Sequence, residues 1–392
     1  MFLNSSRMRG KLLLKNCILA DVKNLRIVPN TNVLVEDGFF RQVGNINEVP
    51  DAQVINLNGK TLTPGLIDAH VHLCLPGLPN CVQIFLSQTE EQRLKALKKN
   101  LSHTIKAGVT TVRDLGSQIE MLRNLRGLEQ DSECYPSVVA SGPVLTTVGG
   151  HAAFIGLITD GVNCAEQIQL AISEGADVIK LIGSGGYATP STNPRKCQYS
   201  DVDFSKIINE ATRLGLNVAC HAHSTAAIDQ CLRFGVYSIE HGTDMIPEQL
   251  PEFINTKTYW VPTFHICVPG EPYGIPVAKM RQNIRSAIEM GVKIAVGTDA
   301  GLDLAPHGTT LAHEMNELMS AGMTSLQVLY AATLQNAIMM GIENRKGSVN
   351  SDKDADFLIY DEDMTTPGFT FHNPSAVYKG GELIISTLSG GG

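Results

Sequence analysis

The chain has 392 residues, of which 43% are hydrophobic and 18% charged, and its formal net charge is −8. This length and composition predict a globular protein with one large α/β domain or a large domain plus a small one. No cluster of Lys and Arg marks a nucleic-acid surface, and no apolar run is long enough to span a membrane, so we expect neither partner. The nine cysteines include no Cys-x-x-Cys pair, which predicts a reducing, cytoplasmic location and no disulfide framework.

Both ends of the chain have the character of short β segments. In residues 1–62, "TNVLVEDGFFRQVG" and "AQVINLNGKTLTPG" carry Asp-Gly, Asn-Gly and Pro-Gly turn signals beside β-branched runs. The same pattern returns in residues 346–392, in "DADFLIYDED" and "SAVYKGGELI". We therefore expect one small β-sandwich domain built from both termini, flanking a larger domain of residues 63–345.

Between the two ends, strand and helix patterns alternate. "KAGVTTVRD", "SEGADVIKL", "RLGLNVACH" and "EMGVKIAVG" each place a helix-ending Gly before a Val-rich strand, as in buried parallel sheets. Eight strands separated by helices have the size and period of a (β/α)8 TIM-like barrel. The strands are predicted at 65–72, 110–114, 137–141, 177–182, 217–221, 237–241, 260–263 and 293–298. The helices are predicted at 90–106, 167–174, 205–214, 226–234, 278–290, 311–320 and 325–340.

Metal-binding side chains follow the ends of several predicted strands. Because the carboxyl ends of barrel strands meet at one face, we expect these side chains to lie close together. Residues i and i+2 of a strand share a face, so His70 and His72 can point at one ion. Imidazole nitrogen and carboxylate oxygen are ligands of zinc and similar divalent metals. The full set is His70, His72, Lys180, His221, His223, Glu240, His241 and Asp299.

Lys180 is the unusual member of this set. A charged and unpaired lysine inside "DVIKLI" would cost on the order of several kcal/mol in a barrel. A protonated lysine also has no lone pair for a metal. After reaction with carbon dioxide, the nitrogen would become a carbamate whose two oxygens could bridge two cations roughly 3.5–4 Å apart.

Each feature alone also fits a structural role. A His-x-His pair can belong to a core, Lys180 can be ion-paired or extend to solvent, and "GTD" can be a turn or helix cap. Arg113 beside Asp114 predicts a structural ion pair, or a contact that supports a ligand. The coincidence of the metal-binding residues at the ends of separate strands favours a metal site.

The motifs "GLIDAHVH", "DVIKLIGSGG", "ACHAH", "SIEHG" and "VGTDAG", in this order, resemble the amidohydrolase superfamily. Within it, the chain resembles the prolidase-like and imidazolonepropionase-related branch of metal-dependent hydrolases. The similarity covers almost the whole chain, including "GKTLTPG" before the barrel. It implies a distorted (β/α)8 barrel, a flanking β-sandwich and two divalent metal ions, with zinc as the expected metal.

The resemblance also implies a role for each ligand. Asp299 would take a proton from the attacking hydroxide and return it to the leaving amine, which a carboxylate near a metal can do. Lys180 would act as the carbamate. The more buried ion would be held by His70, His72 and Asp299, the other by His221 and His241, and carboxylated Lys180 would bridge both ions together with the hydroxide.

Three further residues are candidates for substrate contact. His151 lies in the Gly-rich "TTVGGHAAF", where related enzymes carry a Gly-Gly-His, and packing of the loop is the alternative. His223 could donate to a carbonyl or carboxylate oxygen, or only bond within its loop. Tyr187 belongs to the loop "GSGGYATPSTNPRK", which could cradle a carboxylate or form a flexible lid.

The leading function is hydrolysis of an amide C–N bond in a small substrate, by attack of a metal-bridging hydroxide. Dipeptides or N-acyl amino acids with a free carboxylate are the expected substrates, as in a dipeptidase or carboxypeptidase. A mononuclear deaminase or cyclic-amide hydrolase of the imidazolonepropionase type is the alternative, although it would not need Lys180. A catalytically inactive scaffold is a third hypothesis, and in it the ligands should be lost. The sequence does not determine the oligomeric state, so a homo-oligomer is possible.

Overall fold

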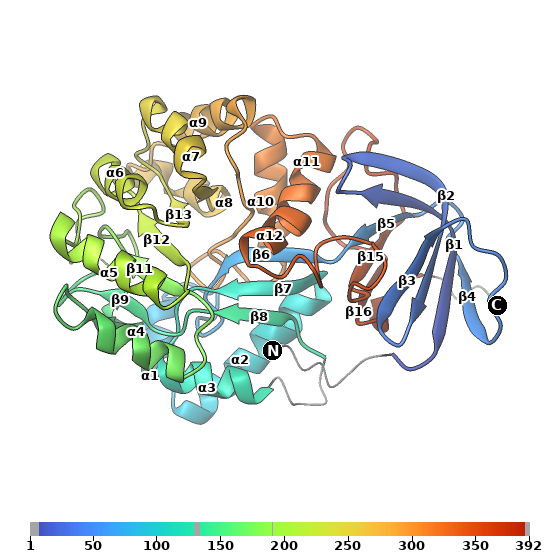
Figure 1. The fold of residues 1–392 in the computed structure, drawn as a ribbon, viewed down its shortest axis with the longest axis horizontal. Coiled ribbons are helices and arrows are strands. Elements are labelled where there is room, and N and C mark those ends of the chain that lie inside the picture. The colour runs from blue at the N-terminus through green and yellow to red at the C-terminus, as the bar shows by residue number, and fades with distance from the viewer. Residues whose placement is uncertain (1–7, 129–133, 190, 389–392) are drawn as a thin grey trace.

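The computed structural model describes residues 8–128, 134–189 and 191–388. A mixed sheet lies at one end of the molecule, and a larger body of parallel strands and helices forms the other end (Figure 1). None of the helices within the described residues combines the length and apolar character needed to cross a membrane.

The mixed sheet contains strands from both ends of the chain, coloured blue and red in Figure 1. Its strand order is β17-β16-β15-β5-β1-β2-β3, and β4 pairs with β1. The strand β5 crosses the boundary predicted after residue 62, while the division into two domains and the sandwich stay predictions. The strands are β1 (Lys11–Asp21), β2 (Arg26–Glu36), β3 (Phe39–Gly44), β4 (Ala52–Asn56), β5 (Thr61–Pro64), β15 (Phe357–Tyr360), β16 (Ala376–Lys379) and β17 (Glu382–Ser386).

A buried lysine ties the mixed sheet to the parallel strands. Lys379 Nζ donates to Asp356 Oδ2 at 2.8 Å, and also to Thr110 O and Ser137 Oγ at 2.9 Å each. The ammonium group is therefore paired and fully hydrogen-bonded although it is buried, which is the condition for tolerating a buried charge. Thr110 and Ser137 lie near the N-terminal ends of two parallel strands, β7 and β8. The Lys379 side chain therefore fixes the mixed sheet against those ends.

The parallel strands form two sheets. One has the order β6-β7-β8 and the other the order β10-β9-β11-β12-β13-β14. Apart from β10, these strands are buried, which agrees with their largely apolar sequences. The short strands β9 and β10 were not predicted, and the others agree with the predictions to within two residues. The strands are β6 (Leu66–Val71), β7 (Val109–Asp114), β8 (Ser137–Ala140), β9 (Val144–Thr146), β10 (Gly156–Ile158), β11 (Ile179–Ile182), β12 (Val218–Ala222), β13 (Ser238–His241) and β14 (Tyr259–Val261).

The two parallel sheets are linked at both ends. Asp177 N donates to Ala140 O at 2.8 Å, next to β8 and β11. On the other side, Trp260 forms a bridge with Ile294, and Val71 forms one with Ala300. The α/β class with parallel sheets is confirmed, and a closed eight-stranded barrel stays a prediction.

The eighth strand, predicted at residues 293–298, is wrong as a strand. The structure has only isolated bridges there, at Ile294 and Ala300. The side chain of Asn336 bonds Val296 on both sides, accepting from its N–H at 3.2 Å and donating to its carbonyl at 2.8 Å. The Val296 carbonyl also accepts from Ala69 N at 2.9 Å, so this segment bonds to β6 as well as to Asn336 without forming a continuous ladder.

The helices agree with the predicted ones at their C-terminal ends and begin up to four residues earlier. Ser and Thr residues cap several N-termini: Thr89 forms a capping box with Gln92, and Ser200 and Ser224 each accept a backbone N–H. The predicted helix 325–340 is interrupted by a π-helical turn, η4 (Ala331–Gln335). The helices are α1 (Cys81–Ser87), α2 (Glu90–Lys106), α3 (Ile119–Leu128), α4 (Cys164–Ser173), α5 (Asp201–Arg213), α6 (Thr225–Phe234), α7 (Leu250–Thr256), α8 (Phe264–Cys267), α9 (Val277–Met290), α10 (Thr309–Ser320), α11 (Ser325–Tyr330) and α12 (Asn336–Met339), with short 3₁₀ turns η1 (Ala153–Ile155), η2 (Pro247–Gln249) and η3 (Val268–Tyr273).

Candidate metal centre

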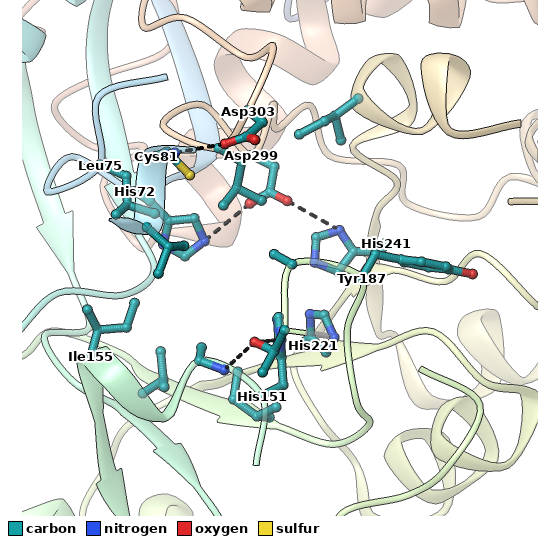
Figure 2. Close-up of a pocket in the computed structure, with 18 of the residues that line it drawn as sticks. His72, Leu75, Cys81, His151, Ile155, Tyr187, His221, His241, Asp299 and Asp303 are labelled. Carbon is teal, nitrogen blue, oxygen red and sulfur yellow. Dashed lines mark hydrogen bonds and ion pairs between the residues drawn. The ribbon is translucent and has the colours of Figure 1, made fainter. Parts of the chain in front are cut away.

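A first group of metal-binding side chains joins the end of β6 to the segment after the Ile294 bridge. Asp299 Oδ1 lies 3.2 Å from His70 Nε2 and 3.2 Å from His72 Nε2. Each residue of the group can offer one ligand atom, and these atoms all lie within 4.8 Å of one another. Figure 2 shows Asp299 between His72 and His241, with dashed contacts to both. The structure therefore brings together the three residues expected at the more buried ion.

The protonation pattern of this first group fits a cation. Glu240 Oε2 lies 2.8 Å from His70 Nδ1, so Nδ1 carries the proton and donates it to the carboxylate. His70 Nε2 then presents a lone pair to Asp299 Oδ1, which has no hydrogen-bond partner. Two acceptors facing each other at 3.2 Å repel unless a positive charge lies between them, so the donor set fits a divalent metal.

A second group consists of His221, His223 and His241. One imidazole nitrogen from each lies within 4.8 Å of the others. Each ring has one nitrogen engaged: His241 Nδ1 contacts Thr263 Oγ1 at 2.7 Å, His223 Nδ1 contacts Thr243 Oγ1 at 3.0 Å, and His221 Nε2 contacts Gly185 O at 3.1 Å. From the sequence, His221 and His241 are expected as ligands and His223 as a substrate contact, whereas distance alone places all three in one group.

These histidines are buried in a way that favours the neutral, metal-binding form. Burial lowers the pKa of His223 to about 3, and it lowers the pKa of His221 and His241 well below the usual value. A neutral imidazole keeps a lone pair at pH 7, which a metal ligand requires.

Lys180 lies against the first group. Its Nζ is 3.4 Å from His70 Nε2, and only 2% of the residue is exposed. Burial lowers the pKa of Lys180, although Glu240 and Asp299 act in the opposite direction. A lowered pKa increases the share of neutral amine, the form that can react with carbon dioxide.

Backbone strain is concentrated at the same place. His241 and Asp299 have φ values of 70° and 62°, and Thr263, the partner of His241, has a φ of 44°. Non-glycine residues adopt this left-handed region rarely, and when they do so the surrounding structure must hold them there. This backbone conformation turns the side chains of His241 and Asp299 toward the other metal-binding residues.

A buried ion pair supports His70 from behind. Arg113 donates to Glu240 Oε1 at 3.0 Å and to Ser238 Oγ at 3.0 Å. Burial would raise the pKa of Glu240, but Arg113 and His70 lower it overall. Of the two roles expected for Arg113 and Asp114, Arg113 has the contact that supports a ligand, through Glu240. Asp114 instead accepts from Leu73 N at 2.7 Å. The role of Glu240 could be suspected only from a carboxylate next to a histidine in the apolar strand "YSIEHG".

A cavity of about 550 Å³ opens onto both groups. Its described lining includes His151, His223 and Tyr187, the three residues expected to contact substrate. His151 Nδ1 contacts Thr189 Oγ1 at 2.8 Å, and burial lowers its pKa to about 4. The ring of Tyr187 packs edge-on against His223, with its hydroxyl pointing away from the labelled histidines in Figure 2. Their contact with a substrate stays a prediction.

The profile of the amidohydrolase family matches residues 61–384 of the chain. Ochratoxinase of Aspergillus niger is 25% identical to it over 90% of this chain and 82% of the relative. Imidazolonepropionase of Symbiobacterium thermophilum is 24% identical over 93% of this chain and 92% of the relative.

Solved structures agree with these relatives. A Xaa-Pro dipeptidase with bound methionine in its active site superposes with a TM-score of 0.87 and 26% identity, covering 95% of this chain and 99% of that structure. The crystal structure of the A. niger ochratoxinase superposes with a TM-score of 0.85 at 22% identity, covering 97% of each chain, and thus shows a shared fold. The resemblance predicted from the motifs is confirmed.

Proposed function

Because the chain belongs to the metal-dependent amidohydrolase family, we propose that it cleaves an amide C–N bond in a small substrate, with two divalent metal ions in the site described above. The observation that carries this proposal is the pair of facing acceptors, His70 Nε2 and Asp299 Oδ1, 3.2 Å apart. The second histidine group on the wall of the same cavity supports a second ion.

In this proposal each ligand has its own task. His70, His72 and Asp299 would hold the more buried ion, and His221 and His241 would hold the other. Lys180, once carboxylated by carbon dioxide, would offer its carbamate oxygens to both ions, and zinc is the expected metal. Glu240 keeps His70 in the tautomer that leaves Nε2 free.

The bound ions would supply Lewis acidity for the substrate carbonyl and lower the pKa of the attacking water. Asp299 accepts the proton of that water and later delivers it to the leaving nitrogen. As an ionised carboxylate, Asp299 can accept a proton in one step and return it in the next. His223, neutral and held through Nδ1 by Thr243, can present its other nitrogen to the substrate carbonyl.

Dipeptides and N-acyl amino acids are the amides suggested by the sequence, and a dipeptidase among the similar structures supports them. The cavity volume of about 550 Å³ suits molecules of that size. Dipeptides and N-acyl amino acids both carry a carboxylate. The side chains that line the cavity determine whether a substrate with this group can bind.

A mononuclear hydrolase of the imidazolonepropionase type is the second candidate. Imidazolonepropionases are among the curated relatives, with coverage of more than nine-tenths of both chains. Against this candidate stands Lys180, whose buried amine next to His70 would then have no part in the site.

The test is an assay of the protein with and without its metal. A panel of dipeptides, N-acyl amino acids, neutral amides and cyclic amides is incubated with protein as purified, after chelation, and after zinc is restored. We expect hydrolysis of at least one linear amide, its loss on chelation and its return with zinc. Turnover that survives complete removal of metal would contradict the proposal, and turnover of cyclic amides alone would favour the second candidate.

A further inference from the structure

The cavity beyond the metal-binding groups has an apolar wall. Its side chains come from strands, loops and the short helix α8, so the wall surrounds the space from several directions. They include Val144, Ile155, Ile182, Ile266, Ile275 and Leu302. Surfaces of this kind bind apolar groups, and a few polar residues fix the orientation.

The described lining has no cation to pair with a substrate carboxylate. The basic side chains of this lining are Lys180, which lies against the first metal-binding group, the histidines of the two groups, and His151. His151 belongs to neither group, and burial lowers its pKa to about 4, so it is neutral at pH 7. Arg195, in the loop where a carboxylate was expected to bind, is absent from that lining and lies 3.4 Å from Asp244, with 67% of its side chain exposed. A buried carboxylate without a partner is costly, so the cavity disfavours one.

The Gly-rich loop also has few backbone donors to offer. Gly186 N donates to Thr192 Oγ1 at 3.1 Å, Gly185 N donates to Lys196 O at 3.2 Å, and Thr189 N donates to Gly186 O at 3.4 Å. N–H groups of a Gly-rich turn can form an anion-binding nest. Because these three groups already bond within the loop, they are not available to an anion.

A carboxylate at the cavity wall makes the environment still less suitable for anions. Asp303 accepts from Asn80 N and Cys81 N, both at 3.0 Å (Figure 2). Burial alone would raise the pKa of Asp303, but the bonds from Cys81 and Asn80 lower it overall, so the group is ionised at pH 7. An anionic substrate group near this side would meet a fixed negative charge.

The loops around Asp303 carry exposed apolar side chains. We call residues 75–80 and 301–306 the rim loops, and they are joined by Gly77 N donating to Gly301 O at 2.8 Å. Leu78 and Leu304, one from each rim loop, expose 52% and 62% of their surface. Neither leucine belongs to the described cavity lining, but each lies on the same loop as a residue that does, Leu75 and Leu302 respectively.

We propose that the substrate is a neutral amide whose group beyond the scissile bond is bulky and apolar, and which carries no carboxylate. This inference rests on the proposed hydrolase function and replaces the carboxylate expected from the sequence. Aliphatic or aromatic amides match the wall, and N-acyl amino acids and dipeptides with free carboxylates do not.

Two matched substrate pairs test the inference with the zinc-loaded protein. In one, N-butylphenylacetamide is compared with N-phenylacetyl-β-alanine, and both release phenylacetate. In the other, N-phenylbutanamide is compared with N-phenylsuccinamic acid, and both release aniline. The two pairs place the charge on the amine side and on the acyl side. We expect the neutral member to have a kcat/KM higher by about tenfold or more in each pair. A preference for the carboxylate in either pair would overturn the inference.

A variant of the wall provides an independent readout. Ile275 is half-buried and lines the cavity, so Ile275→Lys adds a cation where the wall is apolar, and Ile275→Leu is the control. Within each substrate pair, Ile275→Lys should raise the kcat/KM of the carboxylate relative to that of the neutral member by about tenfold. Ile275→Leu should leave this ratio unchanged. An unchanged ratio in a folded Ile275→Lys protein would contradict the inference, and the substrate pairs decide if this variant does not fold.

Failure of the proposed hydrolase activity can be distinguished from failure of the proposed preference for neutral substrates. If no amide is hydrolysed, the proposed function is wrong, and the same four compounds are then compared as ligands by calorimetry. Tighter binding of the neutral members would still support the apolar, cation-free cavity. Equal or tighter binding of the carboxylates would refute it.

Discussion

Glu240 Oε2 lies 2.8 Å from His70 Nδ1, and both side chains are completely buried. The pair is held from behind by Arg113, which donates to the other carboxylate oxygen at 3.0 Å. This arrangement fixes the tautomer and the ring plane of His70 before any metal binds. It also places a paired charge where an unpaired one would destabilise the fold.

Replacement of Glu240 by Gln should therefore affect both the metal and the fold. We expect metal affinity to fall about 10- to 100-fold, since partners behind a ligand have effects of that size. The free energy of unfolding should fall by about 3–5 kcal/mol, because Arg113 loses its buried partner. Metal titration and urea unfolding measure the two effects. The control is Glu289→Gln on the exposed face of α9, and metal affinity equal to this control would show that Glu240 does not position His70.

Asp299→Asn separates proton transfer from metal binding. The amide can still offer an oxygen, but it cannot accept a proton, so kcat should fall by about 10²–10⁴ with part of the metal retained. Metal content and turnover are measured on the same sample. A variant that keeps both its metal and most of its kcat would remove Asp299 from the proton-transfer role.

Lys180→Ala tests the carbamate. Loss of the bridging group should lower the metal content and abolish measurable turnover, whereas Lys196→Ala, an exposed lysine of the following loop, should behave as the native protein. Since only the neutral amine reacts with carbon dioxide, reconstitution of the metal-free native protein should be faster with bicarbonate at mildly alkaline pH. Full activity of Lys180→Ala, or no effect of bicarbonate, would exclude a carbamate bridge.

The stability of the protein should depend on the protonation of His307. This residue donates through Nε2 to Leu75 O at 2.9 Å, its buried Nδ1 has no partner, and burial lowers its pKa to about 4. Between pH 6.5 and 4 the unfolded chain therefore binds a proton that the folded state does not. The contribution of His307 is present above pH 6.5 and is lost as the pH falls, with a slope of up to about 1.4 kcal/mol per pH unit.

His307→Gln keeps a donor for Leu75 O and removes the titration. Its free energy of unfolding should fall less steeply than that of the native protein between pH 6.5 and 4. The exposed His103 serves as the control, through His103→Gln. Identical slopes in native and His307→Gln proteins would contradict the assignment.

The sequence predicted those parts of the fold and site that depend on local pattern. His70 and His72 share a face because of the two-residue period of a strand, and their strand was recognisable from the apolar run before it. The Gly residues that end α6 and α9 have left-handed φ values, as their position after a helical pattern predicts.

Contacts between distant segments were not predictable. Asn336 bonds the N–H and the carbonyl of Val296 from 40 residues away, and the apolar run predicted as a strand at 293–298 has only an isolated bridge, at Ile294. Arg113 on β7 pairs with Glu240 on β13, 127 residues away along the chain, and not with its neighbour Asp114. The apolar cavity wall consists of single side chains from many loops, and the hydrogen bonds that close the Gly-rich loop on itself depend on its three-dimensional path.

We expect each of the two groups of ligands to hold one ion, and the metal content per chain measures this. Protein purified without chelator is analysed by mass spectrometry of its metals, beside Lys180→Ala prepared in the same way. Close to two equivalents in the native protein, with a lower value in the variant, is the predicted result. One equivalent or none, unchanged in Lys180→Ala, would contradict the binuclear site.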